Sequence, residues 1–151
     1  MRVSLTRTLG FRATHRLYNP AWSADENRTR FGWTADEPGH PHDYTCAVTV
    51  TGPLDHDRIV DLPLLDRILA GEITERLDGK HLNLDVPEFA YGRALATCEA
   101  IARDIFQRIA ARLPAGITLA RVRVAEDATL HADCSDEGER REEKGEVSGE
   151  R

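Results

Sequence analysis

The segment from His40 to Gly52, HPHDYTCAVTVTG, constrains the fold most, because it is typical of one long β-strand with two unlike faces. Successive side chains of a strand point to opposite sides of its sheet. One face carries His40, His42, Tyr44, Cys46, Val48 and Val50, and the other carries Asp43, Thr45, Ala47, Thr49 and Thr51. The first face is apolar beyond the histidines, so we expect helices to cover it.

Two later segments have the periodicity of covering helices. Apolar residues recur at intervals of three and four between Leu62 and Leu77, and again between about Thr97 and Leu113. Thr97 is a suitable N-cap for the second helix, and Pro114 stands just past its end. These segments therefore predict two amphipathic helices.

Strands are expected on both sides of these helices. Residues 3–15 favour a first strand, and residues 116–133 favour two more that meet at Glu126 and Asp127. We expect the polar segments 16–39 and 77–96 to be irregular connections, the first long enough to suggest a functional loop. The order of strand, strand, helix, helix, strand, strand predicts an α+β class with an antiparallel sheet.

The chain of 151 residues is long enough for one domain with a single core, which we expect over residues 1–134. Residues 135–151 contain one apolar side chain and many charged ones, so they predict a disordered tail.

Composition limits the partners of this domain. A formal net charge of −6 argues against nucleic acid or an anionic membrane surface as a general partner. No apolar run approaches the roughly 18 residues that a bilayer span needs, and the first residues lack the apolar core of a signal peptide, so a cytoplasmic protein is expected. The three cysteines are far apart in sequence and suggest neither a disulfide framework nor a thiolate zinc site.

Three histidines are candidates for a metal site. His40 and His42 share one strand face, and His15 ends the preceding strand, which a hairpin-like connection would lay beside them. Three imidazoles without a fourth protein ligand are the pattern of a catalytic zinc site, whose open position takes water or substrate. The ordinary alternative is a set of surface or core histidines that bind nothing.

Several blocks together resemble one family. FRATHRLY, GHPHDYTCAVTVTGPLD, LDGKHLNLDVP, TCEAIA and VRVAEDATLHAD follow in order the blocks of the 6-pyruvoyltetrahydropterin synthase and 6-carboxytetrahydropterin synthase family. This resemblance implies the tunnelling fold, with a four-stranded antiparallel sheet and two helices on one face. It also implies homohexamers built as dimers of trimers, with active sites at subunit interfaces.

The same resemblance implies the site's contents. Zinc would be bound by His15, His40 and His42, and the dihydropterin ring by Glu99, with Thr97 beside it as a second substrate-binding residue. Members typically act on the side chain of 7,8-dihydroneopterin triphosphate, where zinc serves as a Lewis acid. By position, Arg12, Arg16 and Arg28 are candidates for holding the triphosphate. Without the resemblance, Glu99 would be a first-turn glutamate favoured by the helix dipole.

The chain departs from this family at two catalytic positions. The usual proton-abstracting cysteine before the histidine pair is missing, and Glu37, three residues before His40, stands where a related subgroup has a glutamate. Gly79 replaces the relay histidine after Asp78, and His81 is a possible substitute. The resemblance also gives Glu126 a role in binding the pterin or relaying protons. Each of these residues has an ordinary reading, as a solvated loop acid, a surface histidine or a turn residue.

Two function classes therefore stay open. One is a zinc-dependent lyase or aldolase acting on 7,8-dihydroneopterin or its triphosphate, with Glu37 as base and Asp78, His81 and Glu126 as helpers. The other is a homologue that still binds a metal and a pterin or purine-like ligand but serves a regulatory role or a different reaction. The absent cysteine and relay histidine favour the second class. The retained metal triad and Glu99 argue against a structural role without any ligand.

Overall fold

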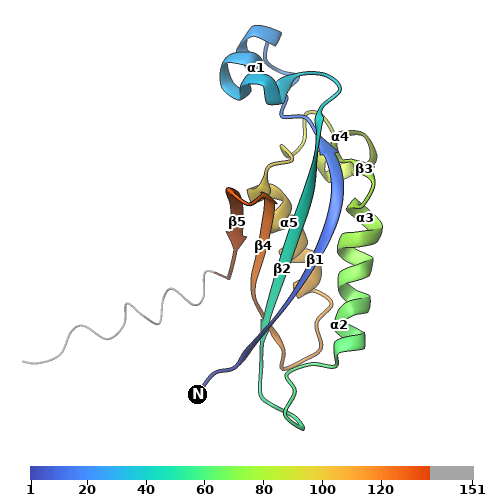
Figure 1. Cartoon of the computed structure of the whole chain (residues 1–151), viewed down its shortest axis with the longest axis vertical. Helices are drawn as coiled ribbons and strands as arrows, with labels where there is room; N and C mark the ends of the chain where they lie inside the picture. Colours follow the sequence, from blue (N-terminus) through green and yellow to red (C-terminus); the bar gives the residue numbers. More distant parts are fainter. Residues whose placement is uncertain (137–151) are drawn as a thin grey trace, which may run out of the picture.

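A computed structural model describes residues 1–136, so residues 137–151 of the predicted tail lie outside the described part (Figure 1). The strands are β1 (Ser4–His15), β2 (His40–Thr51), β3 (Lys80–His81), β4 (Thr118–Asp127) and β5 (Leu130–Cys134). The helices are α1 (Ala24–Phe31), α2 (Leu62–Leu69), α3 (Glu75–Leu77), α4 (Leu82–Asp85) and α5 (Cys98–Ala110). The α+β class is confirmed, and none of these helices is long and apolar enough to cross a bilayer.

The expected four-stranded antiparallel sheet is wrong in strand number and direction. Within the described residues the sheet has five strands in the order β3-β1-β2-β4-β5, and β3 runs parallel to β1. The fifth strand, β3, forms because the segment after Asp78 pairs with the edge of β1 next to Arg12. The Gly79 N–H donates to the Arg12 carbonyl at 2.7 Å, and Asp78 Oδ1 accepts from the Arg12 N–H at 2.9 Å. Part of the predicted irregular connection thereby becomes a short strand.

The first predicted helix is interrupted. It begins at Leu62, after Asp61 accepts the Leu64 N–H at 3.2 Å, but a π-helical turn at Ala70–Thr74 separates α2 from α3. The second predicted helix, α5, begins after Thr97, whose hydroxyl accepts the Ala100 N–H at 3.2 Å. The predicted N-cap is therefore confirmed.

Segment 16–39 is more ordered than an irregular loop. It contains α1 and a 3₁₀ turn at Gly32–Ala35, and in Figure 1 α1 projects beyond the end of the β1–β2 ribbon. Ser23 caps α1 by accepting the Glu26 N–H at 3.1 Å. Acidic residues in the first turn interact favourably with the helix dipole and stabilise the helix. The buried Asn27 amide donates to the Asn19 carbonyl at 2.9 Å. Side-chain capping thus organises a segment that lacks apolar periodicity.

The core lies between one face of the sheet and the helices. The β2 side chains predicted to face inward beyond the histidines are all buried: Tyr44, Cys46, Val48 and Val50. Ile101, Ile105 and Ile109 of α5 pack in the same cluster. The predicted meeting point of the last two strands is slightly displaced, since Glu126 and Asp127 belong to β4 and the turn follows them.

We expect Ile105→Ala to lower the free energy of unfolding by about 2–5 kcal/mol, because Ile105 is fully buried and its truncation leaves a cavity. Gln107→Ala, at an exposed position of the same helix, is the control and should change stability by less than about 0.5 kcal/mol. Urea unfolding followed by circular dichroism measures both. Equal losses in the two variants would contradict the proposed core.

Candidate metal centre

The pairing of β1 with β2 brings the three predicted metal ligands together. His15 is directly opposite His40, and Ala13 is opposite His42, so all three histidines lie on the inner sheet face at one end of the strand pair. One candidate ligand atom from each histidine lies within 4.8 Å of the others. The ring centroids are 4.5 Å apart for His15 and His40, and 4.9 Å apart for His40 and His42.

Hydrogen bonding leaves the correct nitrogens available for a metal. His15 Nδ1 lies 2.6 Å from the Ala96 carbonyl oxygen, and because a carbonyl can only accept, Nδ1 carries the proton. His15 Nε2 then has a free lone pair, and both it and His42 Nε2 are buried without a hydrogen-bond partner in the described residues. Buried polar atoms are normally satisfied. A divalent ion would satisfy both, and a carbonyl that accepts from the other ring nitrogen is typical of metal-binding histidines.

Burial keeps His15 and His40 in the neutral form that metal ligands require. It lowers the pKa of His15 below its usual value of 6.5. The hydrogen bond to Ala96 raises this pKa, while nearby His42 and His81 lower it further. Burial also lowers the pKa of His40 to about 4, with His15 and His42 adding to the effect. Both imidazoles are thus unprotonated at neutral pH.

Glu126 forms one wall of the site. It extends from the inner face of β4, and its Oε2 lies 3.7 Å from His42 Nε2. The Cys98 thiol, at the start of α5, lies 3.9 Å from the same oxygen. Burial is the main cause that raises the pKa of Cys98 to about 12, so this thiol is protonated at neutral pH.

The sequence interpretation missed two residues beside Glu126. Cys98 stands within the TCEAIA block but attracted no prediction, and Tyr44 was taken only as core. The Tyr44 hydroxyl is buried and has no hydrogen-bond partner in the described residues. Tyr44 fits the apolar pattern of β2, so the sequence predicts only a core role for it. That its hydroxyl lies unpaired next to a predicted metal ligand becomes visible only once its burial is known.

Glu37 stands on the loop that leads into β2. Its side chain is 82% exposed, and its Oε1 lies 3.5 Å from Arg16 Nη1. On the same segment Trp33 is 65% exposed and packs against His40, with ring centroids 4.6 Å apart. The loop therefore borders the histidines, while the carboxylate itself points largely into solvent.

Asp78 and His81 lie beside the end of β1, and His81 belongs to the short strand β3. The Asp78 carboxylate accepts from the Arg12 backbone, as described above, and is exposed. His81 Nε2 lies 2.7 Å from the Pro38 carbonyl oxygen and must donate its proton there. His81 Nδ1 is buried without a partner in the described residues and is therefore an available acceptor.

The predicted substrate residues lie at the start of α5. The Thr97 hydroxyl is engaged as the N-cap, and Glu99 is exposed in the first turn. Their substrate-binding roles stay predictions.

The three arginines that position suggested for a triphosphate have different surroundings. Arg12 pairs with Asp43 at 2.9 Å on the exposed outer side, and Arg28 is 77% exposed beside Asp36. Only 13% of the Arg16 side chain is exposed, and it lies inside the structure rather than on a surface.

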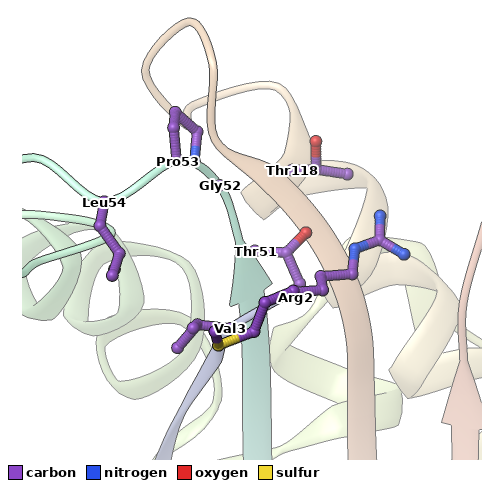
Figure 2. Close-up of a pocket in the computed structure, with 8 residues that line it drawn as sticks. Arg2, Val3, Thr51, Gly52, Pro53, Leu54 and Thr118 are labelled. Carbon is purple, nitrogen blue, oxygen red and sulfur yellow. The ribbon is translucent and has the colours of Figure 1, made fainter.

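A hollow of about 490 Å³ lies far from the histidines (Figure 2). It is lined by Met1, Arg2, Val3, Thr51, Gly52, Pro53, Leu54 and Thr118. Thr51 ends β2 whereas His40 begins it, so the two places are separated by roughly 35 Å of strand. The hollow therefore forms no part of the metal centre.

Comparisons with known proteins agree with this geometry. The family model described as 6-pyruvoyl tetrahydropterin synthase matches residues 4–137. The chain belongs to this family. It is 35% identical to the human 6-pyruvoyl tetrahydrobiopterin synthase over 127 residues, which are 83% of this chain and 86% of that protein. The Drosophila melanogaster protein of the same name is 36% identical over 124 residues, covering 81% of this chain and 73% of that protein.

Solved structures support the expected tunnelling fold. The Caenorhabditis elegans 6-pyruvoyl tetrahydropterin synthase matches with a TM-score of 0.83 and 25% identity, covering 90% of this chain and 96% of that one. The Plasmodium vivax synthase matches with a TM-score of 0.62 and 12% identity, covering 90% and 98%, and this likeness concerns the fold alone. Two variants of the Plasmodium vivax enzyme are described as catalytic residue mutants, in which a glutamate is replaced by cysteine or alanine.

We expect the purified protein to bind about one zinc ion per chain and the His42→Ala variant to bind less than about a fifth of that, because three imidazoles are needed to hold the ion. His131→Ala, which removes an exposed histidine outside the triad, is the control and should retain full binding. Metal analysis by mass spectrometry after dialysis gives the ratio. Equal metal contents in all three proteins would refute the triad.

The lowered histidine pKa values predict how the stability of the metal-free protein depends on pH. The unfolded chain takes up protons near pH 6.5, whereas folded His40 resists protonation down to about pH 4. Its contribution therefore leaves stability unchanged above pH 6.5 and lowers it as the pH falls from 6.5 towards 4. In urea unfolding at pH 7.5 and pH 5, His40→Gln should lose less stability on acidification than the unsubstituted protein. Parallel losses would contradict this assignment.

Proposed function

We propose that this protein is a zinc-dependent lyase that acts on the side chain of 7,8-dihydroneopterin or its triphosphate in pterin biosynthesis. The observation that carries the proposal is the pair of buried, unpartnered Nε2 atoms of His15 and His42, beside His40 in a member of the 6-pyruvoyl tetrahydropterin synthase family. Three imidazoles and no fourth protein ligand suit a catalytic rather than a structural zinc site. A cytoplasmic location belongs to the same proposal.

His15, His40 and His42 would hold the metal. When bound there, zinc would supply Lewis-acid polarisation of the oxygens on the substrate side chain. The protein's own contribution is to present three ring nitrogens from two paired strands and to fix the His15 tautomer through the Ala96 carbonyl. His15 is buried and only 16% of the His42 side chain is exposed, so charges beside these histidines are screened less than in water.

Two carboxylates are proposed to bind the pterin ring. Glu126 faces the site from β4, and Glu99 stands one residue after Cys98, whose thiol contacts Glu126. An ionised carboxylate accepts two parallel N–H bonds and so can orient a ring edge as well as bind it. We assign ring binding to Glu99 with Thr97 beside it. Glu126, which is closer to the histidines, would bind the ring or relay protons.

Glu37 is the proposed general base. It precedes His40 by three residues on the loop that borders the metal centre, and its carboxylate is held near Arg16. A catalytic glutamate in the Plasmodium vivax relative lends support by analogy. Its high exposure requires the side chain to turn towards the bound substrate, which is usual where catalytic contacts form only in the complex.

His81 and Asp78 are proposed as helpers. Because His81 Nε2–H is engaged with the Pro38 carbonyl, the unpartnered Nδ1 is the nitrogen that could accept a proton. Asp78 holds the turn that carries His81 against β1 through its bond to the Arg12 N–H. In this assignment Asp78 helps by keeping His81 in position and does not itself transfer a proton.

The family resemblance also leads us to propose a homohexamer, built as a dimer of trimers. In the described residues β5 is bonded to β4 alone, so its outer edge is available for pairing with another subunit. Such pairing would extend the sheet from one subunit to the next. It would also place the candidate site near a neighbouring chain.

One observation favours the second function class. Gly79, which stands where the resemblance has a relay histidine, adopts a φ of 73° and donates its N–H to Arg12. It provides backbone geometry and no titratable group. A homologue that binds a metal and a pterin but catalyses another reaction, or serves regulation, would show this replacement.

We expect the zinc-loaded protein to convert 7,8-dihydroneopterin or its triphosphate into a pterin with an altered or cleaved side chain, and Glu37→Gln to slow this conversion about 10²- to 10⁴-fold by removing the base. Chromatography with mass spectrometry identifies the products. Asp36→Asn, a neighbouring exposed carboxylate on the same loop, is the matched control and should retain activity within a few fold.

Two results would count against the enzyme proposal in different ways. If both substrates stay unchanged although a pterin binds, the second function class is correct. If turnover occurs and Glu37→Gln leaves it unchanged, the lyase assignment stands and Glu37 is not the base.

A further inference from the structure

The loop that carries Glu37 is packed directly against the metal-binding strand. At Gly39 the backbone has a φ of 110°, and a Cβ added there would lie 2.6 Å from the His15 carbonyl oxygen. Such a separation is far below van der Waals contact, so only glycine fits at this position. The placement of Glu37 relative to the histidines therefore depends on how this short loop is held against the end of β1.

Two side chains hold the loop through carbonyl groups on either side of Glu37. Arg16 Nε donates to the Ala35 carbonyl at 2.6 Å, two residues before Glu37. His81 Nε2 donates to the Pro38 carbonyl at 2.7 Å, one residue after it. The backbone of the loop is thus fixed by Arg16, which directly follows β1, and by His81 of β3.

Arg16 contacts both the loop backbone and the carboxylate. Besides its bond to the Ala35 carbonyl, its Nη1 lies 3.5 Å from Glu37 Oε1. The carboxylate is mostly exposed, so the ion pair alone contributes little. The shorter bond from the largely buried guanidinium to the backbone is the stronger restraint, and it acts on the peptide segment from which Glu37 projects.

Arg16 is itself immobilised. Its guanidinium carbon lies 3.9 Å from the centroid of the Tyr18 ring, and the Tyr91 ring lies further out, at 5.8 Å. The Arg16 N–H donates to Oδ1 of the buried Asn83 at 2.7 Å. A planar guanidinium stacked on an aromatic ring has lost its rotamer freedom before it binds, so it can position another group without a further entropic cost.

We propose that Arg16 is the positioning residue for Glu37: it fixes the loop so that the carboxylate stands at the edge of the metal centre. This inference rests on the proposed function of Glu37 as the base. It replaces the initial interpretation of Arg16 as a triphosphate-binding arginine, because a guanidinium bonded to a carbonyl, stacked on Tyr18 and largely buried is not available to a polyphosphate.

The test compares Arg16→Gln and Arg16→Lys with Arg7→Gln, which removes an exposed arginine of β1 that pairs with Asp66. Loss of the restraint should lower kcat roughly 10- to 100-fold, since a small misplacement of a catalytic group costs about that much, and should change KM less than about threefold. Arg16→Lys should not restore kcat, because lysine lacks the planar fork. Metal content should be equal in all variants. A rise in KM with unchanged kcat would instead restore the phosphate-binding role and overturn the proposal.

A double-substitution cycle separates positioning of Glu37 from a general structural effect. If Arg16 acts through Glu37, adding Arg16→Gln to Glu37→Gln should reduce kcat less than about twofold further. Losses that multiply would show that Arg16 acts elsewhere and would overturn the proposal. Since Glu37→Gln is also measured alone, a failure of Glu37 as the base is recognised independently.

Hydrogen exchange of the loop provides a readout that needs no turnover. The Asp36 N–H donates to the Trp33 carbonyl at 3.0 Å, and the Gly39 N–H donates to the Asp36 carbonyl at 2.9 Å. These amides should exchange roughly tenfold faster in both Arg16 variants, as expected for the loss of one restraining hydrogen bond. They should not change in Arg7→Gln. Unchanged exchange in Arg16→Gln would overturn the proposal even if the protein had no activity on either substrate.

Discussion

The antiparallel register of β1 with β2 is the constraint on which the rest of the site depends. Twelve consecutive pairs run from Ser4 opposite Thr51 to His15 opposite His40. A slip of one residue would turn every side chain of a strand to the other face. It would move the histidines to the outer side and expose Tyr44, Cys46 and Val48 as well. Burial of the apolar core therefore enforces the register that brings the three histidines together.

The parts of the site that follow from strand periodicity could be predicted from the sequence. His40 and His42 share a face because they are two residues apart, and the same alternation places the apolar end of β2 in the core. His15 required one further step, the antiparallel pairing of its strand with β2. Both steps rest on local sequence patterns. Because one face of the sheet must be buried, tertiary contacts have little freedom to change these patterns.

The remaining features depend on contacts between distant segments. Arg16 resembles any surface arginine in the sequence, yet its acceptors lie 19 and 21 residues away. The short strand β3 has no apolar alternation and exists because the edge of β1 offers free backbone groups at Arg12, Ala13 and Thr14. Helix α1 depends on caps and on the buried Asn27 rather than on an apolar stripe. No periodicity signals any of these arrangements.

This division has a consequence for how the chemistry can change. The three candidate metal ligands are fixed by the sheet and by the Ala96 carbonyl, whereas the proposed base Glu37 and the proposed helper Asp78 belong to connecting segments. At Gly79 an added Cβ would meet no atom within 4 Å, so the side chain at this position contributes nothing to packing, and only the φ of 73° restricts it. The fold therefore loses no core contact through having no imidazole at position 79. A loop anchored by Arg16 can offer a carboxylate at Glu37 without disturbing the three histidines, so the metal centre and the proton-handling residues can vary independently.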